Sequence, residues 1–316
     1  MLGRRLISAF IIISVMLLLL WLDFWLGTDQ VLGRPGLVLA VLGILSAGMA
    51  AGELGHLWQN STDRPDSKPL IAGAMAMVAL SCAPVIWKDY PADCPIGKFG
   101  WSFSGVIFAM VLTFVWEMRC FGLTPCPTGQ VTNRIARSAF SFAYLNFLFG
   151  FLVPHRLMQD NNSMGLIAIV LLISTVKLSD SFAYFAGKTL GTIKIAPKLS
   201  PKKTLQGSLG ALVGGCVAVA IVMYMVAPWV FGVTIAKPWW WLLVYGLLVT
   251  TAGLLGDLAE SLLKRAVGAK DSGTLIPGHG GVLDRFDAAM FVAPAVYSYV
   301  VVVVSATCPH ASGCKD

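Results

Sequence analysis

Charged residues are scarce in this sequence. Asp, Glu, Lys and Arg make up 12% of its 316 residues, and hydrophobic residues make up 57%. A water-soluble domain carries about 25% charged residues, and no polar block here is long enough to form such a domain. The composition therefore excludes an ordinary globular protein and predicts an integral membrane protein that crosses the bilayer several times.

Three sequence patterns are also missing. The cysteines form no Cys-x-x-Cys pair, so no zinc site is indicated; Cys308 and Cys314 can pair only if the polar tail faces an oxidising compartment. The segment 187–189 ends like a phosphate-binding P-loop, but Phe182 occupies the position where that motif requires glycine. No internal repeat suggests the inverted halves of a transporter.

Long apolar runs dominate what is present. A membrane-spanning helix needs about 20 mostly apolar residues. Nine runs meet this requirement, at residues 6–26, 36–58, 69–87, 100–118, 139–157, 164–187, 208–233, 238–262 and 286–306. We predict an all-α fold, a polytopic bundle of about nine transmembrane helices that forms a single membrane domain over residues 1–316.

Lysine and arginine are distributed unevenly between alternate loops. One side of the predicted bundle has 16 of them and the other has 6, while Lys177 lies inside a span. Because cytoplasmic loops contain the excess of positive charge, we predict an integral inner or plasma membrane protein with a cytoplasmic N-terminus and with loops 188–207 and 263–285 in the cytoplasm. The net charge of +7 reflects this topology and contact with anionic lipid, and it does not indicate a nucleic-acid partner.

Four acidic residues lie at a similar predicted depth. Asp180, Asp257, Asp284 and Asp287 all fall near the cytoplasmic ends of their helices, where a charge is expensive unless it is paired or functional. Carboxylates in surroundings without His or Cys ligands suit Mg²⁺. We expect Asp257 and Asp284 to bind this ion, with Asp287 and Asp271 as further candidates.

Lys177, Asp180 and Tyr184 share one face of the sixth predicted span, because they are three and four residues apart. Two interpretations stay open for this face. Lys177 and Asp180 form an ion pair that holds the bundle together, or the face opens onto a cytoplasmic site.

Basic and hydroxyl side chains precede the seventh predicted span. Ser200, Lys202, Lys203 and Thr204 lie just before a helix N-terminus, a position that favours anions. A triphosphate can bind there; in the alternative interpretation, this loop only sets the topology.

The loop before the last span is rich in glycine. Gly280 and Gly281 follow His279 and allow a close approach of the backbone to a ligand. We expect His279 to form a hydrogen bond with phosphate or backbone, and Arg285 to bind phosphate with its fork of donors.

The run Ser261–Asp287 reads SLLKRAVGAKDSGTLIPGHGGVLDRFD. It closely resembles the signature of phosphatidate cytidylyltransferases, also called CDP-diacylglycerol synthases. Asp180, Tyr184 and residues 200–204 are also similar to this family, so the resemblance covers about the last 140 residues. Residues 161–316 are then expected to contain the catalytic helices and loops, whereas residues 1–160 match the family only as hydrophobic spans.

The resemblance implies a reaction at the cytoplasmic membrane face, in which CTP and phosphatidic acid give CDP-diacylglycerol and pyrophosphate. It implies Mg²⁺, with room for a second cation that bridges the phosphates, and it suggests a homodimer. The metal ligands would be Asp257, Asp284 and Asp287. The triphosphate would be neutralised by Lys202, Lys203 and Arg285. The phosphatidate head or the nucleotide would be held by Lys264, Arg265 and Lys270. Supporting roles would fall to Ser200, Thr204, Ser261 and Asp271.

Several rival functions use similar chemistry. The motif constrains the head group and the nucleotide more than the lipid tails, so an ether or isoprenoid lipid phosphate is an alternative substrate. A CTP-dependent lipid kinase is a more distant alternative. A transporter would place its polar groups near the bilayer centre, whereas here they gather at one face. A CDP-alcohol phosphatidyltransferase is not indicated, because its Asp-Gly-x₂-Ala-Arg pattern is absent.

Overall fold

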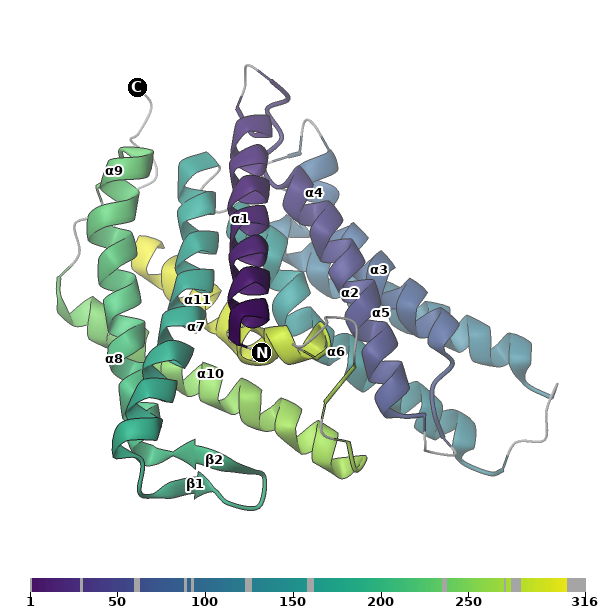
Figure 1. Ribbon diagram of the computed structural model, residues 1–316. Helices are drawn as coiled ribbons and strands as arrows, with labels where there is room; N and C mark the ends of the chain where they lie inside the picture. Colours follow the sequence, from purple (N-terminus) through teal and green to yellow (C-terminus); the bar gives the residue numbers. More distant parts are fainter. Residues whose placement is uncertain are drawn as a thin grey trace.

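The protein is a bundle of long helices with one short hairpin (Figure 1). The computed structural model describes residues 2–28, 31–59, 63–87, 90–91, 94–122, 127–157, 162–234, 238–269, 271–273 and 280–305. Its helices are α1 (Leu2–Leu26), α2 (Leu37–Leu57), α3 (Ser67–Ser81), α4 (Ala83–Ile86), α5 (Gly97–Cys120), α6 (Gln130–Arg156), α7 (Asn162–Leu190), α8 (Leu205–Ile221), the π-helical η2 (Val222–Val226), α9 (Ala227–Phe231), α10 (Trp240–Ala266) and α11 (Leu283–Ser305). The strands are β1 (Lys194–Ala196) and β2 (Ser200–Thr204).

Seven helices within the described residues are long and apolar enough to cross a membrane. The protein is thus an integral, multi-pass membrane protein, and the predicted helical bundle is confirmed. The predicted span 69–87 is interrupted, because α3 ends at Ser81 and the next helix begins with Pro84 near its N-terminus. Proline lacks the N–H that would continue the helix. The predicted span 6–26 lies within α1, a helix of 25 residues.

The ends of the helices alternate as the charge pattern predicts. A Cβ atom at Gly36, which precedes α2, would lie 3.1 Å from Arg156 at the end of α6 and 3.6 Å from Val85 in α4. These connections therefore meet at one end of the bundle. The segment α3–α4 completes a passage between the two ends despite its break (Figure 1).

A buried ion pair joins four helices at that end. Arg156 Nε lies 2.6 Å from Asp23 Oδ2, and both side chains are fully buried. Asp23 also accepts hydrogen bonds from backbone amides at the start of α2. Arg156 in turn donates to the backbone and side-chain oxygens of Asn162 in α7. Together, these contacts hold α1, α2, α6 and α7 in register.

Glycine allows two pairs of helices to pack closely. A Cβ atom at Gly210 of α8 would lie 2.8 Å from the Phe182 carbonyl oxygen of α7, and one at Gly256 of α10 would lie 2.6 Å from the Asp287 carbonyl oxygen of α11. Small residues at such positions are typical of membrane helix contacts. These two contacts bring polar residues of α7, α10 and α11 toward the same end of the bundle.

A β-hairpin that was not predicted replaces the loop between α7 and α8. Strands β1 and β2 pair antiparallel, with Lys194 opposite Thr204 and Ala196 opposite Ser200. Figure 1 shows the hairpin at the lower end of the molecule, beyond the end of α7 and beside α10. The hairpin thus fixes the direction of basic side chains that a free loop would leave mobile.

Candidate active site

A cavity of about 470 Å³ lies between the hairpin and helices α7, α8, α10 and α11. Seven residues that were predicted to form the site line it: Asp180, Tyr184, Ser200, Lys202, Lys203, Thr204 and Asp257. The remaining lining includes apolar residues such as Val176, Val249 and Val292. The cavity therefore combines a cationic wall, acidic groups and an apolar side, and its volume suits a small-molecule ligand.

The cationic wall and the acidic group on α10 are in direct contact. Lys203 Nζ of β2 lies 2.5 Å from Asp257 Oδ2, and both side chains remain partly exposed. The Lys177 and Asp180 side chains interact electrostatically but form no ion pair, so the interpretation of this face as a structural clamp is not supported. Asp180 instead faces the cavity.

The base of the hairpin is fixed by side chains. Thr204 Oγ1 accepts a hydrogen bond from the Gly207 amide at 3.1 Å and thereby caps the N-terminus of α8. Gln206 Oε1 accepts from the amides of Thr192 and Ile193, and its Nε2 donates to Thr192 Oγ1. Thr204 was predicted to bind substrate; its hydroxyl is used in this cap, although the residue also borders the cavity.

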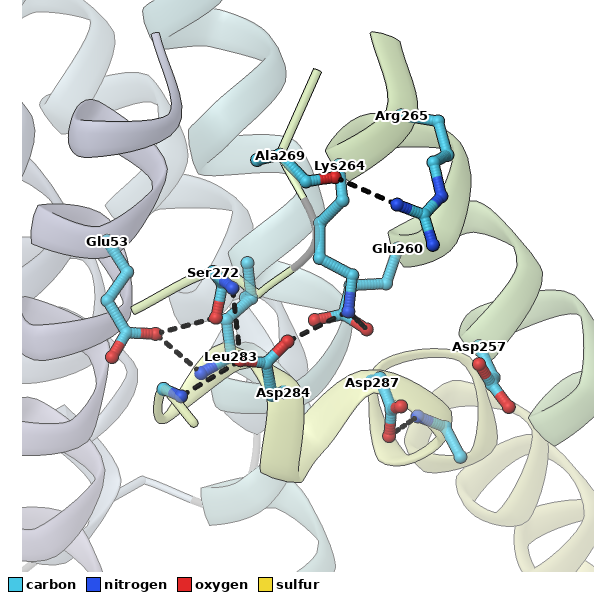
Figure 2. A network of polar contacts seen from close by, with 12 residues as sticks. Glu53, Asp257, Glu260, Lys264, Arg265, Ala269, Ser272, Leu283, Asp284 and Asp287 are labelled. Atoms are coloured by element: carbon cyan, nitrogen blue, oxygen red, sulfur yellow. Dashed lines mark hydrogen bonds and ion pairs between the residues drawn. The ribbon is translucent and has the colours of Figure 1, made fainter. Parts of the chain in front are cut away.

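A second polar network surrounds Asp284 at the start of α11 (Figure 2). Lys264 Nζ donates to Asp284 Oδ1 at 2.8 Å and to Glu260 Oε2 at 2.9 Å. Asp284 Oδ2 accepts from the backbone amides of Ser272 and Gly281, at 3.0 and 2.9 Å. Asp284 therefore binds one lysine and holds two loop segments together.

Two residues that sequence reasoning missed have unsatisfied polar atoms beside this network. Glu260 is 1% exposed and Tyr144 of α6 is 3% exposed. Glu260 Oε1 and Tyr144 Oη have no hydrogen-bond partner among the described residues, and Tyr144 lies within electrostatic range of Glu260, Asp257 and Asp287. Buried polar atoms without partners are costly, so both are suited to meeting a ligand.

The other predicted residues lie around these two clusters. Arg265 donates to the Ala269 carbonyl oxygen at the end of α10, Ser261 lies on α10, and Arg285 is exposed near the start of α11. Asp271 borders a separate groove between α2 and α3. Gly280 has a positive φ of 84°, a conformation that favours glycine. Lys270 and His279, like Cys308 and Cys314, lie outside the described residues.

Comparison with known proteins identifies the family of this chain. The sequence model of the cytidylyltransferase family matches residues 3–303. The chain belongs to the cytidylyltransferase family. It is similar to "Phosphatidate cytidylyltransferase" of Synechocystis, with 42% identity over 147 residues, 46% of this chain and 47% of the relative. The protein of that name from Bacillus subtilis is 39% identical over 154 residues, 49% of this chain and 54% of the relative.

A plant relative is also similar to this member of the cytidylyltransferase family. "Phosphatidate cytidylyltransferase 4, chloroplastic" of Arabidopsis thaliana is 38% identical over 142 residues, 45% of this chain and 34% of the relative. The chain thus spans about half of the two bacterial relatives and about a third of the plant one.

In this cytidylyltransferase, the pair Asp257 and Asp287 is better suited to a magnesium ion than Asp284 is. Among the described residues, no three His, Cys, Asp or Glu side chains are grouped to hold an ion. Mg²⁺ commonly takes one or two carboxylates and completes its shell with water and phosphate oxygens. Asp257 and Asp287 lie on neighbouring helices (Figure 2) and interact electrostatically with each other and with Asp180. Asp257 contacts one lysine, Lys203, whereas Asp284 accepts from a lysine and also from two backbone amides, which leaves fewer of its lone pairs for an ion.

Proposed function

We propose that this protein transfers CMP from CTP to phosphatidic acid and thereby forms CDP-diacylglycerol and pyrophosphate. The observation that supports this most directly is the cavity in which Lys202 and Lys203 face the acidic groups Asp180 and Asp257. Its cations suit a triphosphate, and its apolar side suits a lipid that remains in the bilayer. The family and the printed names of the relatives agree with this activity.

The proposed chemistry needs no side-chain nucleophile. A phosphate oxygen of phosphatidic acid attacks the α-phosphorus of CTP and forms a new P–O bond, while the bond between the α-phosphorus and the bridging oxygen breaks and pyrophosphate leaves. Positioning and charge stabilisation are the main contributions of a protein to such transfers. Lys202 and Lys203 would bind the nucleotide phosphates, and Lys264, held by Asp284, would bind the lipid phosphate.

Magnesium belongs to the proposal. Asp257 and Asp287 would hold the ion, and bound magnesium would neutralise the charge of the phosphate oxygens. Chelation with EDTA should stop the reaction, and added Mg²⁺ should restore it. Undiminished turnover after chelation would exclude this assignment.

The proposed orientation places the hairpin and the second network at the cytoplasmic face. CTP is a cytosolic solute, and the loops at this end contain the excess of Lys and Arg. We also propose a homodimer, which chemical crosslinking in lipid nanodiscs would test: a species of one chain at all crosslinker concentrations would refute it.

The decisive experiment incubates the purified protein with labelled CTP and phosphatidic acid in mixed micelles. Pyrophosphate release with a labelled CDP-lipid is the expected result. Release of CDP together with a phosphorylated lipid alcohol, when diacylglycerol or an isoprenoid alcohol replaces phosphatidic acid, would favour the kinase instead. An ether-linked or isoprenoid phosphate that reacts faster than phosphatidic acid would identify a different lipid substrate.

A further inference from the structure

A glutamate from the N-terminal half reaches the start of α11. Glu53 of α2 is 5% exposed, and its carboxylate accepts three hydrogen bonds (Figure 2). Val282 N donates to Oε1 at 2.7 Å, Leu283 N donates to Oε2 at 2.8 Å, and Ser272 Oγ donates to Oε2 at 3.2 Å. More than 200 residues of sequence separate Glu53 from each of these donors.

These contacts are the ones a helix N-terminus requires. The first amides of a helix have no partner within it, and the helix dipole makes this end partly positive. A nearby residue of the same segment usually caps such amides. Here Glu53 Oε2 binds the amide of Leu283, the first residue of α11, and Oε1 binds the amide of Val282 directly before the helix, so a residue from a different helix does the capping.

The loop segments on either side are fitted to this carboxylate. A Cβ atom at Gly273 would lie 3.0 Å from Glu53 Oε1, and one at Gly281 would overlap both Glu53 Oε2 and Ser272 Oγ. A larger side chain at either glycine would push the segment away from the carboxylate. The local sequence is therefore adapted to a buried anion at this point.

The same loop segments also hold Asp284. Ser272 binds Glu53 through its hydroxyl and Asp284 through its amide, and the amide of Gly281 binds Asp284 next to the two amides that bind Glu53. Asp284 in turn accepts from Lys264. A displacement at Glu53 is thereby transmitted to Asp284 and to the lysine that it orients.

We propose that Glu53 is a positioning residue, which fixes the start of α11 and so aligns Asp284 and Lys264 for transfer. This inference rests on the proposed function for its kinetic consequence. The cavity that contains Lys202, Lys203 and Asp257 does not include Glu53. Glu53 should therefore affect the rate of transfer much more than the binding of CTP.

The test compares Glu53→Gln, Glu53→Asp and a control in the full-length protein. Glutamine has one acceptor oxygen and places an NH₂ group against backbone N–H donors. Hydrogen bonds to charged groups are strong, so we expect kcat to fall about tenfold or more, with the KM for CTP changed by less than about twofold. Glu53→Asp keeps the charge and both oxygens and should restore part of the lost rate.

Glu117→Gln is the matched control. Glu117 is also a buried glutamate on a membrane helix, at 6% exposure, and its carboxylate lies 3.7 Å from Arg134 rather than near α11. This variant should keep its kcat. If Glu117→Gln loses as much rate as Glu53→Gln, the effect is a general response to a changed buried charge and the proposal is wrong.

Hydrogen exchange supplies a readout that does not depend on turnover. In Glu53→Gln, the amides of Val282 and Leu283 should exchange faster, while those within α7 and α8 stay as in the wild type. Unchanged exchange at these two amides, or an unchanged kcat, would overturn the proposal. A wild-type protein that forms no CDP-lipid would instead refute the proposed function, and the exchange result would still decide whether Glu53 holds α11.

Discussion

Lys203→Ala tests the assignment of the cationic wall to CTP. The substitution removes an ammonium group that lies 2.5 Å from Asp257 and whose side chain is 18% exposed. A hydrogen bond to a charged group contributes about 1.5–3 kcal/mol, and about 1.4 kcal/mol changes an equilibrium constant tenfold. We therefore expect the KM for CTP to rise by about 10- to 100-fold. The lost ion pair itself should matter little for stability, because Asp257 is 37% exposed and solvent screens the pair.

The assay is a CTP titration at a fixed surface concentration of phosphatidic acid, with pyrophosphate release as the signal. Lys198→Ala is the control, because Lys198 lies in the turn of the same hairpin, is exposed and does not line the cavity. It removes the same charge from the same hairpin. If the two variants raise the KM for CTP equally, or if neither changes it, the hairpin contributes only a general positive charge and the assignment of Lys203 fails.

Three further predictions concern other parts of the molecule. Asp284→Asn should lower kcat by about a hundredfold through misplacement of Lys264, in a protein that still folds; full activity would show that Asp284 is not part of the site. Gly256→Ala should lower both unfolding temperature and activity, whereas Gly253→Ala, where a Cβ atom would have an ordinary contact of 3.5 Å, should be tolerated; equal behaviour would refute the close-packing argument. Arg156→Met should reduce the free energy of unfolding by about 3–5 kcal/mol, measured by denaturation in detergent, and a loss below about 1 kcal/mol would contradict it.

Much of the architecture was predictable because apolar runs of membrane length are a strong signal. The sequence predicted nine spans, and seven helices among the described residues are long and apolar enough to cross a membrane. The break after Ser81 was missed because the residues around Pro84 are as apolar as those of the helix. A hydropathy profile does not detect that proline lacks a backbone N–H. The hairpin was missed because residues 194–204 show no alternation of apolar and polar residues.

The site was predictable where residues lie in one motif and unpredictable where they meet through the fold. Asp257 and Lys203 were both expected, but their contact depends on a hairpin that folds against α10. Glu53 was missed because its partners are more than 200 residues away. One signal was available, since a single acidic residue inside an apolar span is expensive and requires a partner. The sequence alone does not identify the partner of Glu53.

The pairing of Asp23 with Arg156 has a consequence for biogenesis. The two residues are 133 positions apart, so at a synthesis rate of about 5–20 residues per second the arginine follows the aspartate by roughly 7–27 s. The backbone partners of Asp23 in α2 are only 13 to 16 positions away and emerge almost at once. The nascent chain can thus form its first helical hairpin early, and Arg156 at the end of α6 joins this hairpin only after α3, α4 and α5 have been synthesised.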